Sequence, residues 1–144
     1  MKKLKGLIIM LMISLCLFGF CGCQGEGGGA DNETDGSNTN THSYEQITGE
    51  KAKDIMDSGV EYVLIDARTE SEFAEGHIEG AILIPEYEIA DKAEQKIPDK
   101  DALILVYCRS GRRSKIASEE LVKLGYTNVK EFGGIIDWQY EIVK

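Results

Sequence analysis

Two short apolar runs restrict the fold of this chain more than any other feature of its sequence. Tyr62–Ile65 and Leu103–Tyr107 contain only aliphatic or aromatic residues, and each is followed by a segment with helical spacing of apolar positions. A strand that is apolar on both faces is typical of a parallel sheet, because helices cover both faces of such sheets. The runs therefore predict an α/β fold with a mostly parallel central sheet and helices on both faces.

Other segments extend the alternation to about five strands. Short strands are predicted at 44–47, 82–84 and 129–132, the second of them buried and stopped by Pro85. Helices are predicted after Thr48, after the capping-box sequence Thr69–Glu72, at 86–96, and from about Arg112 to Gly125. The positions expected on the apolar helix faces are Ala52, Ile55, Met56, Ile89, Ala90, Ala93, Ile116, Ala117, Leu121 and Leu124.

The N-terminal segment has the features of an export signal. Three lysines among residues 2–5 precede a largely apolar run at 7–20, and Gly22-Cys23 then resembles a bacterial lipoprotein cleavage site. We expect residues 1–22 to be removed and Cys23 to be lipidated. The alternative is an uncleaved anchor over residues 6–23, which carry no charge and are just long enough to span a bilayer. Both readings place the protein on the outer face of the bacterial cell membrane.

Residues 23–43 follow as a flexible acidic tether, and residues 44–144 form the folded domain. Gly, Asp, Glu, Asn, Ser and Thr dominate the tether, which lacks any aliphatic side chain larger than that of Ala30. Cys16 and Cys21 would leave with the signal and Cys23 would carry lipid, so Cys108 would be the only free thiol of the mature protein.

The second apolar run leads directly into Cys108 and a turn that contains Gly111 and three arginines. Loop amides and the positive end of the following helix point at any anion bound there, and the arginines add positive charge. This setting predicts a reactive thiol whose pKa lies well below the free value of about 8.5. The alternative is a buried structural cysteine, a common fate of this residue type.

Charge restricts the partners of the chain. With 16 basic and 25 acidic residues the net charge is −9, which disfavours nucleic acid as a ligand. Three of the basic residues nevertheless lie within 108–113, so this segment is interpreted as an anion site. Asp66 and Arg68 also follow a predicted strand, and the carboxyl ends of parallel strands meet at one edge of a sheet. The two segments are therefore expected to lie close together.

Four segments of the chain resemble the rhodanese domain family, in the family's order and spacing. They are Asp66–Arg68 with Glu72-Phe73, Gly76–Ala81 with Ile84-Pro85, Tyr107–Ser114, and Gly133-Gly134 with Trp138. The resemblance covers residues 44–144. It implies a rhodanese-like fold, and an enzyme that moves a sulfane sulfur from a donor such as thiosulfate to a thiol or cyanide through a persulfide on Cys108.

Site roles are assigned from this resemblance together with the chemistry of the loop. Cys108 is the expected nucleophile, and the loop amides of 109–113 would cradle its anion. Arg113 resembles the family's loop arginine that binds the donor. The remaining expected members of the site are Arg109, Ser110, Gly111 and Arg112 as substrate-binding residues, Ser114 as a helix cap, and Asp66 and Arg68 as a structural ion pair. His77 is expected to be structural and Trp138 to lie in the core.

Three other functions remain open at this stage. A cysteine phosphatase or arsenate reductase shares the fold, but its loop has five residues between cysteine and arginine, a spacing that here ends at Ser114, one residue past Arg113. A non-enzymatic sulfur carrier or sensory module is the second alternative. A redox protein is the third, although the mature chain would lack a resolving cysteine. No cofactor and no metal are expected, and the chain is expected to be a monomer.

Overall fold

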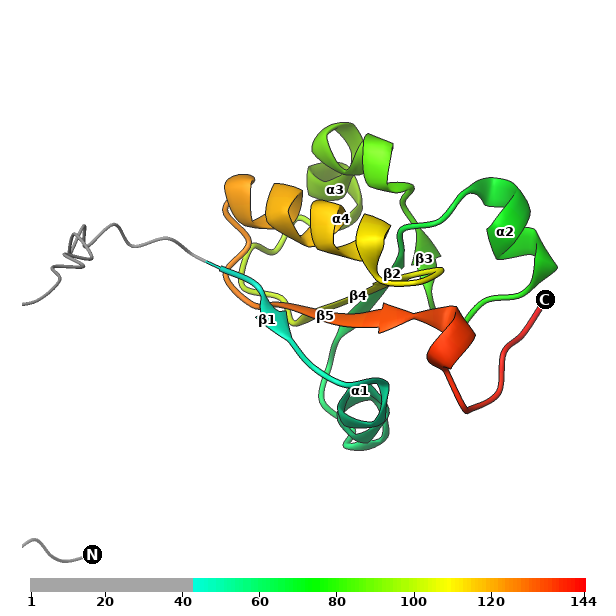
Figure 1. Cartoon of the computed structure of the whole chain (residues 1–144). Helices are drawn as coiled ribbons and strands as arrows, with labels where there is room; N and C mark the ends of the chain where they lie inside the picture. Colours follow the sequence, from blue (N-terminus) through cyan, green and yellow to red (C-terminus); the bar gives the residue numbers. More distant parts are fainter. Residues whose placement is uncertain (1–42) are drawn as a thin grey trace, which may run out of the picture. The chain divides into compact units, whose positions relative to one another are not determined.

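The computed structural model describes residues 43–144, which form a five-stranded parallel sheet with the strand order β1-β5-β4-β2-β3 (Figure 1). The strands are β1 (Glu45–Gln46), β2 (Val63–Asp66), β3 (Ile82–Leu83), β4 (Ile104–Cys108) and β5 (Val129–Gly134). All four pairings between neighbouring strands are parallel. The predicted α/β class and the mostly parallel sheet are therefore confirmed.

Helices cover both faces of the sheet, as predicted. Figure 1 shows α1 (Gly49–Asp57) on one face, and α3 (Ile89–Lys96) with α4 (Arg112–Lys123) on the other. The central strand β4 serves two cores, since Ile104, Val106 and Cys108 join the cluster under α3 and α4. Leu105 and Tyr107 alternate with them and join the cluster on the α1 side. This two-sided burial explains why the β4 segment is apolar throughout.

Local signals set where the first two helices begin. The Thr48 side chain caps α1 by accepting a hydrogen bond from the amide of Lys51 at 3.1 Å. At α2 (Glu70–Glu75) the predicted capping box is present, with Thr69 and Glu72 satisfying each other's backbone amides. Such caps satisfy amides that have no partner within the helix, so both helix starts are encoded locally.

Two predicted inward positions are wrong. Ala90 is exposed, because the buried positions of α3 are Ile89 and Ala93, four residues apart, and Ala90 lies a quarter-turn away. Ile116 is 42% exposed, because the inward face of α4 consists of Ser114, Ala117, Ser118 and Leu121. Short side chains at these positions fit against the sheet, and the longer Ile116 points to solvent.

The remaining elements differ from the predicted boundaries by a few residues. The predicted helix at 86–96 is divided into a 3₁₀ turn, η1 (Glu86–Glu88), and α3. Strand β3 ends at Leu83 and is only partly buried at the sheet edge, while Ile84 is buried just beyond it. The last strand extends through Gly134 and leads into the short turn η2 (Ile135–Asp137).

The predicted signal peptide and nearly all of the predicted tether lie outside the described residues. Across residues 43–144, the search for a helix both long enough and apolar enough to cross a membrane found none.

Candidate active site

Cys108 is the last residue of β4, and the loop 109–111 connects it directly to α4. Its side chain is only 1% exposed and belongs to the core cluster under α3 and α4. The Gly111 amide nevertheless donates a hydrogen bond to Sγ, with N and S 3.1 Å apart. The sulfur therefore packs against apolar side chains on one side and faces a backbone donor on the other.

The polar contacts outweigh burial in setting the acidity of this thiol. Burial of the sulfur raises the pKa of Cys108. Hydrogen bonding from the amides of Ser114, Ser110 and Gly111 opposes burial, and the pKa lies below the usual value for a cysteine. This direction favours the interpretation of a reactive thiol over an inert structural cysteine.

Glycines allow the loop to approach strand β5. Gly111 has φ +95°, a left-handed backbone conformation that residues with a side chain rarely adopt, at the point where the loop leads into α4. A Cβ at Gly134 would lie 2.2 Å from the carbonyl oxygen of Arg109 and 2.5 Å from Cα of Ser110. That carbonyl accepts a hydrogen bond from the amide of Ile136 at 3.2 Å. Strand β5 and the turn η2 that follows it thus support the cysteine loop through backbone contacts.

Ser114 and Glu131 form a buried polar link beside the loop. The Ser114 hydroxyl donates to Oε1 of Glu131 at 2.7 Å, and the amide of Gly133 donates to the same oxygen at 2.8 Å. Both side chains are buried. Sequence analysis assigned Glu131 no role, because it lies 23 positions after Cys108 on a strand with no chemical motif of its own.

Arg113 is held by a carboxylate from another helix. Its two terminal nitrogens each contact one oxygen of Glu72 at 2.7 Å, which joins α4 to α2. The Arg113 guanidinium, together with the capping contacts of Thr69, outweighs burial and lowers the pKa of Glu72 to about 2. The positive charge of Arg113 is therefore largely matched within the protein, and sequence analysis missed Glu72 as its partner.

The other two loop arginines differ from Arg113. Arg109 and Arg112 are both exposed, and neither forms an ion pair with any residue in 43–144. Arg109 is the first residue after Cys108 and Arg112 is the first residue of α4, so their charges raise the positive potential where an anion would approach the loop.

Asp66 and Arg68 lie at the same sheet edge as Cys108, but they face the other side of the sheet. Asp66 is in register with Tyr107 on the neighbouring strand, so its side chain points to the α1 side and Cys108 points to the α4 side. Arg68 and Asp66 form a buried ion pair with a closest N···O distance of 2.6 Å. The Tyr107 hydroxyl donates to the same carboxylate at 2.6 Å. The ion pair and this hydrogen bond therefore have a structural role, because they hold the ends of β2 and β4 together next to the site.

The other residues singled out in the sequence have structural contacts. His77 stacks on Phe73 with ring centroids 3.7 Å apart, and its backbone pairs with Val143.

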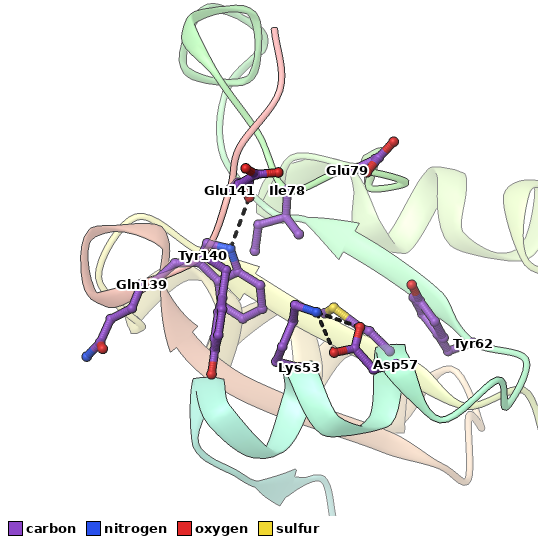
Figure 2. Close-up of a pocket in the computed structure, with 10 residues that line it drawn as sticks. Lys53, Asp57, Tyr62, Ile78, Glu79, Gln139, Tyr140 and Glu141 are labelled. Atoms are coloured by element: carbon purple, nitrogen blue, oxygen red, sulfur yellow. Dashed lines mark hydrogen bonds and ion pairs between the residues drawn. The ribbon is translucent and has the colours of Figure 1, made fainter.

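Trp138 packs against the core cluster on the α1 side and, with Lys53 and Tyr140, lines a cavity of about 750 Å³ (Figure 2). None of the residues that line this cavity belongs to the cysteine loop. Within residues 43–144, no group of three or more His, Cys, Asp or Glu side chains is arranged to hold a metal ion.

Known proteins are similar to the described part of this chain in both sequence and fold. Thiosulfate sulfurtransferase PspE of Escherichia coli (strain K12) is 40% identical over 73 residues, which cover 51% of this chain and 70% of that protein. Adenylyltransferase and sulfurtransferase UBA4 of Candida albicans is 36% identical over 88 residues, but the match covers only 20% of that protein's length. The matched region of this second relative is thus a small part of a larger protein.

Solved structures agree with these sequence matches. A structure described as a rhodanese with anions from E. coli is 37% identical and has a TM-score of 0.56, and the match covers 58% of this chain and 99% of that chain. The family model described as a rhodanese-like domain matches residues 48–141, which is most of the chain and includes every residue of the site described above. The chain therefore belongs to the rhodanese-like family.

Proposed function

We propose that the protein is a sulfurtransferase that carries a sulfane sulfur as a persulfide on Cys108. The observation that carries the proposal is the hydrogen bond from the Gly111 amide to Sγ, at a thiol whose pKa is below its usual value. The names of the relatives support the same chemistry, since PspE of E. coli is a thiosulfate sulfurtransferase.

The proposed reaction has two displacement steps. The Cys108 thiolate attacks the outer sulfur of thiosulfate, the S–S bond of the donor breaks, and sulfite leaves with the electron pair. A thiol or cyanide then attacks the terminal sulfur of the persulfide, and the Cys108 thiolate is regenerated. The Cys108 thiolate and its persulfide are both anions, so backbone donors that face the sulfur stabilise each of them.

The arginines of the loop and of the first turn of α4 have different proposed roles. Arg109 and Arg112 are exposed and unpaired within the described part of the chain, so we assign them the anionic end of the donor. The charge of Arg113 is largely matched by Glu72, so we assign Arg113 the role of fixing the start of α4 against α2. A similar E. coli structure is described as containing anions, which is consistent with an anion-binding loop.

The test of this function is the Cys108→Ser variant. Its rate of thiocyanate formation from thiosulfate and cyanide should fall by at least about a thousandfold, because the covalent intermediate cannot form. In the parent protein, thiosulfate should add one sulfur to Cys108 and cyanide should remove it. Mass spectrometry can read this on the tryptic peptide Asp101–Arg109, which contains no other cysteine.

Two outcomes would contradict the proposal. Thiocyanate formation by Cys108→Ser near the parent rate would exclude this nucleophile. Hydrolysis of an aryl phosphate, with no sulfur gained on the peptide, would instead support the cysteine phosphatase alternative.

The proposed location rests on the N-terminal sequence alone. We propose that the mature domain is anchored by lipid on Cys23 to the outer face of the bacterial cell membrane, and that it meets its donor and acceptor there. The export-signal pattern of residues 1–22 supports this proposal.

A further inference from the structure

A negative charge from another helix lies beside the proposed anion site. The carboxylate of Glu72, on α2, contacts the two terminal nitrogens of Arg113 at 2.7 Å each. The pKa of Glu72 is about 2, so this carboxylate is charged throughout the neutral pH range. The proposed reaction gives Glu72 no part, although a carboxylate lowers the positive potential that attracts an anionic donor.

Arg113 is close to the reactive sulfur by its place in the chain. It lies two residues after Gly111, whose amide donates to Sγ of Cys108 at 3.1 Å. Neighbouring Cα atoms are about 3.8 Å apart, so the Cα atoms of Gly111 and Arg113 are at most about 7.6 Å apart. The pKa of Arg113 is raised, first by its hydrogen bonds to Glu72 and also by the charge of Cys108. The guanidinium charge therefore acts on any donor bound at the sulfur.

Pairing with Glu72 distinguishes Arg113 from the other two arginines of this segment. Arg109 and Arg112 are exposed and form no ion pair with any residue in 43–144. The side chain of Arg113 is only 17% exposed, and the paired carboxylate fixes its guanidinium and matches its charge. An incoming donor thus meets two arginines with unmatched charge instead of three.

We propose that Glu72 is a specificity-determining residue that lowers the preference of the site for doubly charged sulfur donors over singly charged ones, because it matches the charge of Arg113. The inference rests on the proposed sulfur-transfer function. Coulomb energy is proportional to the charge of the donor, so an unmatched charge near the site affects a dianion about twice as strongly as a monoanion. Thiosulfate, a dianion, therefore loses more from the Glu72–Arg113 pair than a thiosulfonate or a persulfide anion does.

The test compares thiosulfate with methanethiosulfonate, in which a methyl group replaces one anionic oxygen. With either donor the Cys108 thiolate attacks the outer sulfur, the S–S bond breaks, and sulfite or methanesulfinate leaves with the electron pair. Cyanide then removes the sulfur as thiocyanate. The measured quantity, in the full chain, is the ratio of kcat/KM for thiosulfate to kcat/KM for methanethiosulfonate. A merely structural disturbance of the loop would change both values alike and leave this ratio unchanged.

Glu72→Gln should raise the ratio. The substitution leaves the charge of Arg113 unmatched and keeps the capping box of α2, because glutamine also serves at that position. We expect kcat/KM to rise about tenfold for thiosulfate and about threefold for methanethiosulfonate, so the ratio should rise about threefold.

Glu86→Gln is the matched control for this variant. Glu86 interacts with Arg113 through charge without a hydrogen bond, and its removal should change the ratio by less than about 1.5-fold. An unchanged ratio in Glu72→Gln, with folding checked by thermal unfolding, would overturn the proposal. An equal rise in Glu86→Gln would also overturn it, because the direct contact would then have no special effect.

Variants of Arg113 test the same pair even if Glu72→Gln does not fold. Arg113→Gln leaves the Glu72 charge unmatched, so the ratio should fall about threefold. The double variant Glu72→Gln/Arg113→Gln removes both charges, and its ratio should return to within about 1.5-fold of the parent value. An unchanged ratio in Arg113→Gln would overturn the proposal. A double-variant ratio well below the parent value would overturn it too, because Arg113 would then bind the donor despite Glu72.

Failure of this inference and failure of the proposed function give different results. If neither donor adds a sulfur to the parent peptide Asp101–Arg109, Cys108 is not a sulfur carrier and both fail. If sulfur is added but the ratio is the same in the parent, Glu72→Gln and Arg113→Gln, only this inference fails.

Discussion

Gly134 is the position where one methyl group would disturb the candidate site most directly. The Cβ of Gly134→Ala would overlap the carbonyl oxygen of Arg109 at 2.2 Å, and neither atom can rotate away, because the backbone fixes the position of both. The loop amides would shift by a large fraction of an ångström from the sulfur. We expect thiocyanate formation to fall by about a hundredfold, the typical cost of a misplacement near 1 Å.

Gly49→Ala is the matched control. A Cβ there would meet the Trp138 ring at 3.6 Å, an ordinary contact, in the first turn of α1. The control should keep the parent rate of thiocyanate formation and the parent thermal midpoint. If Gly134→Ala also kept the parent rate, the loop would not depend on strand β5 for its geometry.

Helices α2 and α4 are joined by the Glu72–Arg113 ion pair, which gives stability a defined pH dependence. The pKa of Glu72 falls from 4.5 to about 2 on folding, so the pair stabilises the fold above pH 4.5 and this contribution is lost as pH falls toward 2. Relative to the parent, Glu72→Gln should lose about 1–2 kcal/mol of unfolding free energy at pH 7, as expected for a partly buried charged hydrogen bond.

Urea unfolding at a series of pH values measures this difference. The gap between the parent and Glu72→Gln should narrow as the pH falls from 4.5 and should close below pH 2, where the carboxyl group is protonated in both the folded and unfolded states of the parent. Asp57→Asn, which breaks the exposed pair with Lys53, is the control and should change stability by less than about 0.5 kcal/mol. A constant gap between parent and Glu72→Gln down to pH 2 would contradict the assigned cause.

The predictable parts of the elements are those that depend on neighbours in sequence. The caps at Thr48 and Thr69 involve residues three apart, and the apolar strand runs reflect burial of each strand by itself. On α4 the predicted inward positions Ala117 and Leu121 are confirmed and only Ile116 is wrong, because the exact rotation of the helix is set by close packing on the sheet. There, buried Ser114 and Ser118 fit where the larger Ile116 would not.

The candidate site likewise contains some residues that are close in sequence and others that only the fold brings to the loop. Cys108, Gly111 and Ser114 lie within seven residues, so one stretch of sequence contains them all. Glu72, Glu131 and Gly134 reach the loop from α2 and β5, and no local pattern pairs them with it. The sequence placed Asp66 and Cys108 at one edge of the sheet, but only the register with Tyr107 shows that their side chains lie on opposite faces.

The protein is acidic overall, yet its candidate site is proposed to bind a small anion. A net charge of −9 would repel thiosulfate over most of the surface, so the exposed Arg109 and Arg112 supply local attraction where it is needed. Cys108 is the only cysteine among residues 43–144. A persulfide formed there therefore has no thiol of the same domain with which to form a disulfide, and transfer to an external acceptor is the expected outcome.

Attachment to the membrane is expected to depend on Cys23 alone among the N-terminal cysteines. Lipid chains contribute about 0.8 kcal/mol for each buried CH₂, so a lipidated Cys23 would hold the domain in the membrane fraction of a bacterial host. Cys23→Ser should remove most of the protein from that fraction, and Cys21→Ser, the matched control, should not. Immunoblotting of membrane and soluble fractions measures the distribution. If Cys23→Ser stays in the membrane at its full length, the uncleaved anchor over residues 6–23 is the correct alternative, because that segment needs no lipid to span a bilayer.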